Sequence, residues 1–324
     1  MDQLANPTST PPVPAAVSGA VVPPPVPARR EEPWRGILYV VLALFFFSCS
    51  DASSKYLTDT LSSVQVTWLR FVVFAAVMVP VAWFWGGASA FRSSRPGLQT
   101  LRSLGVLGSA LLFVMGLRYL PMAEATTMGF MSPIFVTALS IPFLGERVGI
   151  RRWAAVIVGL VGVIVVVRPG GDAFDQAAIF PILSALSWAV ALIVTRKMKD
   201  ADHPLTTLLY PALIGCTILS VLTVFDWRNM GQTEILFGLI TGLTSTIAQG
   251  LIVLAFRHAG ASLLAPFFYT QLLWSAALGY FMFGSIPDGW TFVGAGIIAA
   301  SGLYTAHRER VRAAQDGALQ PDVR

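Results

Sequence analysis

Charged side chains interrupt two of the most apolar stretches of this sequence. In LFFFSCSDASSKYL, Leu44 to Leu57, Asp51 and Lys55 stand where hydrocarbon-favouring residues would otherwise continue, and Arg70 interrupts the next apolar run. A carboxylate, an ammonium and a guanidinium can pair with one another, carry a proton or bind opposite charges on a ligand. Inside hydrocarbon each charge costs at least about 2.5 to 3.5 kcal/mol, so it persists where it meets a partner or water.

The spacing of these charges allows two interpretations. Asp51 and Lys55 are four residues apart, so they share one face of a helix and could pair there, while Arg70 offers Asp51 a second partner. A pair that only locks helices together is one explanation of the pattern. In the other, Asp51 titrates or binds a cationic group and Arg70 holds an anionic one. That arrangement would suit a zwitterionic ligand.

A second set of polar and aromatic side chains occurs in later apolar runs. It comprises Trp188, Tyr210, Gln249, Tyr269, Gln271 and Trp274. Buried amide and phenol groups need hydrogen-bond partners, and aromatic faces can stack on planar or cationic ligands. Interhelical bonding and packing explain any one of them. As a group they favour a pocket for a planar ligand.

Glu124 follows Arg118 closely and begins another apolar run. Together with Asp51, Lys55 and Arg70 these charges would form a charged vestibule at the outer end of the helices. The simpler explanation of Glu124 is a solvated helix start, because the positive end of the helix dipole favours a carboxylate.

The elements that carry these residues are predicted from composition. The chain has 324 residues, of which 55% are hydrophobic and 12% charged, and its mean hydropathy is +0.68. A soluble domain usually carries about 25% charged residues. The sequence therefore predicts an all-α integral membrane protein.

Apolar runs of the length that crosses a bilayer occur ten times. An α-helix needs about 20 residues to cross a hydrocarbon core of roughly 30 Å. The predicted spans are Gly36 to Tyr56, Val64 to Trp85, Leu98 to Tyr119, Met122 to Leu144, Trp153 to Val167, Ala177 to Lys197, Leu205 to Phe225, Glu234 to Phe256, Ser262 to Phe283 and Trp290 to Ala306.

The two halves of this pattern show weak internal similarity. Arg118 matches Arg257 and, without a gap, Gly145 matches Gly284. Five helices per half place the second copy in the opposite orientation, which predicts ten transmembrane helices arranged as two inverted five-helix repeats. The predicted organisation is a disordered leader at 1–33, repeats at 34–168 and 174–307, and a disordered tail at 308–324. A site near mid-membrane between the repeats follows from it.

Two further features bear on orientation and assembly. Most arginines and lysines fall on one side if the N-terminus is cytoplasmic, which predicts that both termini are cytoplasmic in a bacterial inner membrane. The other side receives only Lys55, Arg118, Arg168 and Arg228. Small residues at every fourth position of the eighth span could serve the seam between halves, the preferred interpretation, or a homodimer. They are Gly238, Gly242, Thr246 and Gly250.

The stretch MGLRYLPMAEATTMGFMSPIFVTALSIPFLGERVGIRRWAAVIVGLVGVIVVVRPG resembles the EamA-like branch of the drug/metabolite transporter superfamily, over about Trp34 to His307. The resemblance implies ten helices in two repeats and transport of a small organic metabolite. SDASSKYL, VQVTWLRF and SSRP are similar to the bacterial group that includes S-adenosylmethionine and riboflavin uptake carriers. Other members of the family export amino acids or metallophores.

Other functional classes find little support in the sequence. His203, His258 and His307 have no carboxylate or cysteine at the spacing of metal ligands, so no metal site is expected. No cofactor is expected. No nucleic-acid partner is expected either, because the basic residues are spread over many short segments. A membrane-embedded transferase would need a catalytic histidine or paired carboxylates at a membrane face. The remaining prediction is a secondary transporter, with a metabolite and the lipid bilayer as its partners.

Overall fold

The computed structural model describes residues 33–145, 150–167, 176–198, 202–259 and 261–318. Within these ranges the chain forms α-helices and short 3-10 helices, and it contains no strand there. The prediction of an all-helical fold is therefore confirmed. The predicted leader, apart from Pro33, lies outside the described residues.

The first part of the chain contains six α-helices and one short 3-10 helix. They are α1 (Pro33–Leu57), α2 (Ser63–Gly86), η1 (Gly87–Phe91), α3 (Pro96–Tyr119), α4 (Met122–Gly129), α5 (Ser132–Leu144) and α6 (Ile150–Val167).

The second part repeats this alternation of long helices and short connections. Its elements are η2 (Gln176–Ala178), α7 (Ile179–Lys197), α8 (Pro204–Thr223), η3 (Val224–Asp226), α9 (Gln232–His258), α10 (Ala261–Leu264), η4 (Ala265–Tyr269), α11 (Thr270–Phe283) and α12 (Gly289–Ala318).

Local sequence signals explain where several helices begin and end. The Ser62 side chain caps α2 by accepting a hydrogen bond of 3.3 Å from the backbone N–H of Gln65, which satisfies one of the free donors of a helix start. Gly145 and Gly284 follow α5 and α11 in the left-handed conformation, with φ of 68° and 65°. Glycine adopts this conformation without steric cost. The two glycines matched between the halves thus end their helices in the same way.

Two of the predicted spans are discontinuous helices. The span from Met122 divides into α4 and α5, and Pro133 lies in the first turn of α5. The span from Ser262 divides into α10, η4 and α11, and Pro266 lies in the first turn of η4. Proline lacks a backbone N–H and clashes with the preceding turn, so a helix tends to restart at such a residue.

Within the described residues, seven helical segments are long and apolar enough to cross a membrane. The segments α6 and α12 contribute only shorter apolar stretches, Val156–Val167 and Gly289–Ser301, and α11 has 14 residues. The prediction of ten membrane-spanning helices therefore includes three helices that do not meet this criterion of length and hydropathy. The helix α12 also continues to Ala318, so the tail predicted to be disordered from 308 is helical over its first part, where Arg, Glu, Ala and Gln favour helix.

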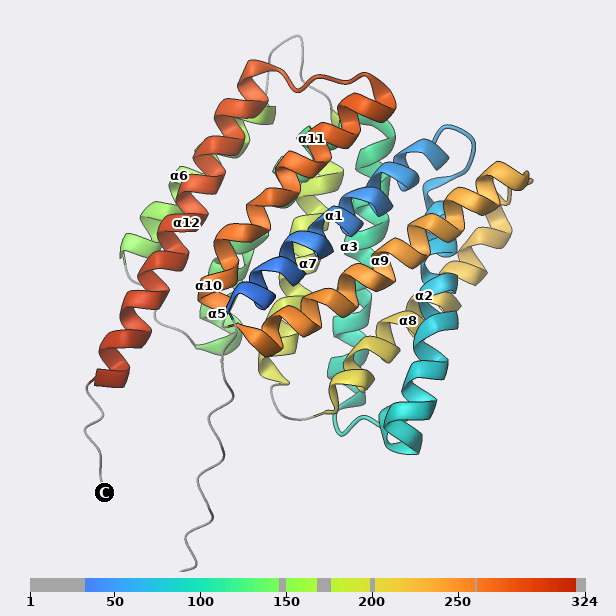
Figure 1. The fold of residues 1–324 in the computed structure, drawn as a ribbon, viewed down its shortest axis with the longest axis horizontal. Coiled ribbons are helices and arrows are strands. Elements are labelled where there is room, and N and C mark those ends of the chain that lie inside the picture. The colour runs from blue at the N-terminus through green and yellow to red at the C-terminus, as the bar shows by residue number, and fades with distance from the viewer. Residues whose placement is uncertain (1–32, 146–149, 168–175, 199–201, 260, 319–324) are drawn as a thin grey trace, which may run out of the picture. The chain divides into compact units, whose positions relative to one another are not determined.

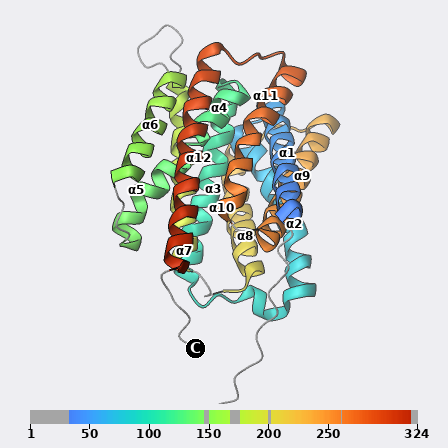
Figure 2. The same cartoon turned by 60° about the vertical axis from the view of Figure 1, so that its left-hand side comes forward.

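Helices from the two parts of the chain pack against each other in pairs. The helix α1 lies along α9, α3 along α7, α2 along α8 and α6 along α12. In Figure 1, α6 and α12 occupy one flank, α2 and α8 the other, and the remaining long helices lie between them; the turned view in Figure 2 shows the same pairing of α6 with α12. The core is therefore built from contacts between sequence-distant helices.

Glycines allow the closest of these approaches. A Cβ atom at Gly242 of α9 would overlap Val73 of α2, and one at Gly238 would lie 2.7 Å from Leu69 of α2. These two members of the small-residue stripe therefore lie at the contact between the first and second parts of the chain. That position agrees with the predicted seam, although Gly250 has open space around it.

A loop cluster outside the apolar helices ties the segment after η1 to the start of α8. The Asp202 carboxylate accepts hydrogen bonds from the Ser93 hydroxyl (2.5 Å), the Ser94 backbone N–H (2.7 Å) and the Gln99 amide (2.8 Å). Burial alone would raise the pKa of Asp202, but these hydrogen bonds favour the ionised form and lower the pKa to about 2. The carboxylate therefore stays charged and holds the two loops together.

Candidate functional site

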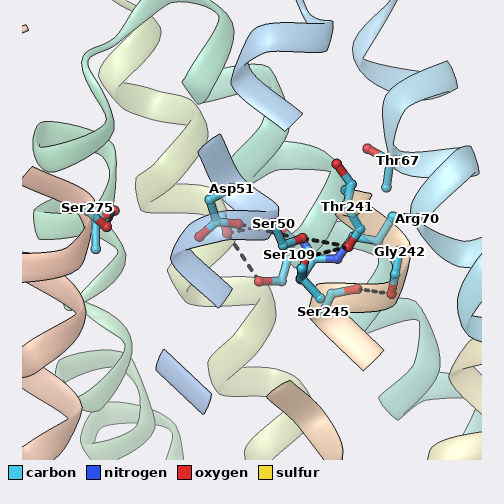
Figure 3. A network of polar contacts seen from close by, with 12 residues as sticks. Ser50, Asp51, Thr67, Arg70, Ser109, Thr241, Gly242, Ser245 and Ser275 are labelled. Carbon is cyan, nitrogen blue, oxygen red and sulfur yellow. Dashed lines mark hydrogen bonds and ion pairs between the residues drawn. The ribbon is translucent and has the colours of Figure 1, made fainter. Parts of the chain in front are cut away.

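The charged pair of the site joins α1 to α2. One oxygen of the Asp51 carboxylate lies 3.7 Å from Nη1 of Arg70, and the side chains are only 6% and 15% exposed. Asp51 stands six residues before the end of α1, and Arg70 stands seven residues after the start of α2. Both residues therefore lie about 10 Å along their helix axes from the turn that joins α1 to α2. Figure 3 shows the pair among hydroxyl groups from several helices.

The second part of the chain contributes polar groups to the same place. The side chain of Gln271 of α11 lies near the Asp51 carboxyl group. The Ser50 hydroxyl donates a buried hydrogen bond of 2.9 Å to the backbone carbonyl of Thr241 on α9. The Asp51–Arg70 pair therefore lies where α1 and α2 meet α9 and α11.

A second pair of hydroxyl groups lies nearby between α3 and α7. The Ser184 hydroxyl donates to the Ser109 carbonyl at 2.8 Å, and the two side-chain oxygens are 3.1 Å apart. Figure 3 shows Ser109 beside Asp51 and Ser50. The hydroxyls of Ser109 and Ser184 therefore add hydrogen-bonding atoms to the interior around the Asp51–Arg70 pair, although the helices there are mostly apolar.

Several buried hydroxyls around the pair have spare hydrogen-bonding capacity. Among the described residues, the side-chain oxygens of Ser48, Ser54 and Thr241 find no hydrogen-bond partner. Arg70 makes no hydrogen bond within the described part of the chain and has only the single ion pair with Asp51. A guanidinium carries five N–H donors, so most of its capacity is open to an additional partner.

Lys55 does not pair with Asp51, which corrects one of the alternatives drawn from the sequence. Its ammonium donates hydrogen bonds of 2.8 Å to the backbone carbonyls of Leu117 and Leu120, at the end of α3. It also lies 5.6 Å from the centre of the Phe283 ring. The free carbonyls and negative dipole at a helix C-terminus attract a cation more strongly than a neighbour one turn away that is already paired.

Glu124 lies in the first turn of α4 and is half-buried. It interacts electrostatically with Lys55, as does Asp59 in the turn after α1. The predicted neighbourhood of Lys55 and Glu124 therefore exists at the end of the bundle where α1 ends. Two residues further along α4, the Thr126 hydroxyl donates to Ser275 of α11 at 3.0 Å.

The predicted aromatic and amide residues do not all gather around the charged pair. Tyr269 stacks on Phe130 with ring centres 5.0 Å apart, and Trp274 meets the edge of Phe45 at 5.1 Å. The Trp274 indole nitrogen is buried and has no hydrogen-bond partner among the described residues. Trp274 thus packs against α1, the helix that carries Asp51, and Tyr269 packs against the residue that follows α4.

One of the other three members of the set lies far from the pair. The Tyr210 hydroxyl donates to the Phe91 carbonyl at 3.5 Å, at the opposite end of the bundle from Lys55. Trp188 of α7 is 41% exposed. Gln249 of α9 is partly buried. Sequence reasoning grouped these residues by their chemistry, which gives no information on which helix faces meet.

Sequence reasoning also missed residues of this neighbourhood. Ser50, Ser109, Ser184 and Thr241 supply hydroxyls or carbonyls next to the pair, and Phe130 provides a ring. The serines of SCSDASS inside an apolar run were a usable signal for the first of them. The others stand alone in ordinary apolar helices and give no such signal.

Comparison with known proteins identifies the family. A model of the EamA-like transporter family matches residues 34–168 and, a second time, residues 176–305. The chain belongs to the EamA-like transporter family. The resemblance in the sequence is thereby confirmed.

Curated relatives of this EamA-like protein are named as transporters. An S-adenosylmethionine uptake transporter of Rickettsia bellii is 29% identical over 85% of this chain and 94% of its own length. A riboflavin transporter of Vibrio cholerae is 28% identical over 86% and 95%, and the pseudopaline exporter CntI of Pseudomonas aeruginosa is 26% identical over 82% and 94%. These names confirm the prediction that the chain is a transporter and not an enzyme.

A solved crystal structure of another protein has the same fold. It superposes with a TM-score of 0.58 at 20% identity and covers 84% of this chain and 98% of its own. At that identity the likeness concerns the fold alone. The EamA-like chain therefore matches both its family and the solved fold over most of its length.

Proposed function

We propose that this EamA-like protein is a secondary transporter that moves a small zwitterionic or planar organic metabolite across the inner membrane by alternating access. The observation that carries the proposal is the Asp51–Arg70 pair, which is buried between the two parts of the chain. Relatives that carry S-adenosylmethionine and riboflavin support a substrate of this class.

The geometry of the pair supports a role in binding. A single contact of 3.7 Å is longer than the 2.7 to 2.9 Å of a strong charge-assisted hydrogen bond. Taking two charges out of water costs several kcal/mol for each, and a loose contact recovers this poorly. A substrate carboxylate at Arg70 and a substrate cation at Asp51 would recover more. The pair is thus better suited to an exchange of partners than to permanent packing.

The helix pairs support two inverted five-helix repeats at 34–168 and 174–307. If α7 is the counterpart of α1 and α9 that of α3, a two-fold axis relates the α1–α9 pair to the α7–α3 pair, and both pairs occur. The pairs α2–α8 and α6–α12 would each lie on that axis. Two successive matches to the family model have the same division. In this arrangement the repeats rock against each other around the site.

The distribution of charge supports an orientation with both termini in the cytoplasm. Under that orientation most arginines and lysines face the cytoplasm, as they do in most inner-membrane proteins. The end of the bundle with Lys55 and Glu124 would then face the periplasm. Substrate entering from that side would meet the charged neighbourhood before it reached Asp51.

The alternative direction of transport is export. A relative named as the pseudopaline exporter CntI supports it, and a carrier with near-symmetric halves can run either way according to the gradients. Vesicles of defined orientation discriminate the two, because uptake into right-side-out vesicles indicates import and uptake into inverted ones indicates export.

The experiment that tests the proposal is uptake by proteoliposomes of the purified protein. The panel contains labelled S-adenosylmethionine, riboflavin and aromatic amino acids, each with and without an imposed pH gradient. We expect saturable uptake of at least one compound, with Asp51→Asn abolishing the flux or its pH dependence at unchanged expression. Arg70→Lys keeps the charge but loses the planar fork, so a severe defect would indicate recognition of a carboxylate. Wild-type flux in both variants would refute the proposed site.

A further inference from the structure

Two aromatic rings meet where the two discontinuous helices are interrupted. Phe130 follows α4 immediately, and Tyr269 is the last residue of η4, directly before α11. Their rings stack at 5.0 Å between centres with an angle of 23° between planes, and both residues are partly buried. The breaks in the two helices thus bring one ring each to a common point.

The stack ends a seam between α4 and α11. Along this seam Gly279 faces Met122, where an added Cβ atom would lie 3.8 Å from the Met122 Cβ, and Ser275 accepts a hydrogen bond from Thr126. Residues four apart share a helix face, so the next position in this row after Met122 and Thr126 is Phe130, the residue that caps the end of α4. The seam therefore holds the Phe130 ring in place against the second part of the chain.

The same seam connects the stack to the charged pair. Gln271 precedes Ser275 by four residues and so lies on the face of α11 that meets α4. Its side chain lies near the Asp51 carboxyl group. The ring pair and the charged pair are thus two neighbouring parts of one region, with Gln271 between them.

The position of the two rings in the proposed repeats is also equivalent. The same interval of positions separates Arg118 from Arg257, Gly145 from Gly284 and Phe130 from Tyr269. Each ring is therefore the other's counterpart, and the stack lies on the axis that relates the halves. A residue at this axis stays at the centre whichever way the repeats rock.

The Tyr269 hydroxyl is available for another partner. Among the described residues it makes no hydrogen bond, although the ring is partly buried. A phenol in such surroundings usually finds a partner. An unused donor beside a flat aromatic surface is what a planar ring with polar atoms at its edge would engage.

We propose that Phe130 and Tyr269 form the platform that selects substrates carrying a planar heteroaromatic ring, with the charged end of the same substrate at Asp51 and Arg70. This inference rests on the proposed transport function and specifies its substrate class. The ring stacks on the aromatic pair, and the Tyr269 hydroxyl hydrogen-bonds a polar atom at its edge. Phe130 is the specificity-determining residue that the sequence did not reveal.

The test measures binding of S-adenosylmethionine and riboflavin by the purified full chain, together with competition by L-methionine, which has a zwitterionic end but no ring. Loss of one stacking partner is expected to weaken the binding of the ring-bearing compounds about ten- to a hundredfold, the size that base–aromatic stacking energies give. Phe130→Leu should therefore show this loss and leave L-methionine competition unchanged. Phe130→Tyr should restore binding, and Tyr269→Phe should cost only about three- to tenfold, the value of one hydrogen bond.

Phe268→Leu is the matched control, because it removes the adjacent ring of η4, which stacks on Phe256 instead. It should bind the ring-bearing compounds as the wild type does. Equal loss of ring-bearing and ring-less compounds in a well-folded Phe130→Leu protein would overturn the inference, as would unchanged affinity. Wild-type binding restricted to ring-less metabolites would overturn it too, while leaving the transport function itself supported by flux in vesicles.

Discussion

Removing both charges of the Asp51–Arg70 pair separates its structural role from its functional one. Arg70→Met leaves the Asp51 carboxylate buried without its counter-charge, and Asp51→Asn leaves the guanidinium in the same condition. The double variant removes both charges and leaves a neutral amide at position 51. If the pair serves binding, the double variant should fold as well as the wild type and yet carry no substrate.

The magnitudes follow from the distance and burial of the pair. At 3.7 Å the attraction is about 4 kcal/mol with an effective dielectric constant of 20, and the desolvation of two ions costs at least as much. The net contribution to stability is therefore close to zero. Removal of one partner alone costs about 3 to 5 kcal/mol, which corresponds to a decrease in Tm of about 4 to 7 °C for a chain of this size.

The assay is thermal unfolding in detergent, followed by uptake in proteoliposomes with the same preparations. We expect each single variant to lose stability, the double variant to regain it to within about 1 kcal/mol, and all three to lose flux. A double variant as unstable as the singles would show that the pair contributes to packing. Normal flux in a stable double variant would refute the binding role altogether.

Four further variants test separate parts of the structure. Asp202→Asn should lower Tm at neutral pH. The pKa of Asp202 is depressed from 3.8 to about 2, so the stabilisation by its carboxylate is complete above about pH 4 and is lost as the pH falls towards 2. The Tm difference between the variant and the wild type must therefore narrow over that interval. A constant difference would contradict the assignment. Lys55→Met removes two hydrogen bonds at the end of α3 and should cost about 2 kcal/mol, measured as a Tm decrease of about 3 °C. Loss of flux at unchanged Tm would instead indicate ligand contact. Gly242→Ala forces a Cβ atom onto Val73 and should lower the free energy of unfolding by about 1 to 3 kcal/mol. Gly250→Ala is the control, because open space surrounds that position, and it should leave Tm unchanged or slightly raised. Equal effects of the two substitutions would contradict the close α2–α9 packing.

The helical fold and the charged residues of the site could be predicted because their signals are local. Apolar runs of bilayer length locate most helices, and a charge within such a run stands out. The sequence offered two cationic partners for Asp51, Lys55 and Arg70, but it could not show which of them pairs with the carboxylate. Lys55 is nearer in sequence, yet the free carbonyls that end α3 bind it, and only the three-dimensional arrangement brings them within reach.

The remainder of the site depends on which helix faces meet. Tyr269 and Tyr210 have the same chemistry, but one lies beside Gln271 and the other at the far end of the bundle. Phe130 is one apolar residue among many and becomes distinctive only because a helix break places it against Tyr269. Asp202 lies in a polar loop, where charge is expected, so its role as a tie between loops left no trace in the sequence pattern.

The measurement that tests the central claim most directly is equilibrium binding of the transported compound to the Asp51→Asn/Arg70→Met double variant in detergent, beside the wild type. The account predicts saturable binding by the wild type and at least a hundredfold weaker binding by a double variant of equal thermal stability, because both charged contacts to the substrate are gone. Equal affinity in the two proteins would contradict it and would place the substrate site elsewhere in the bundle.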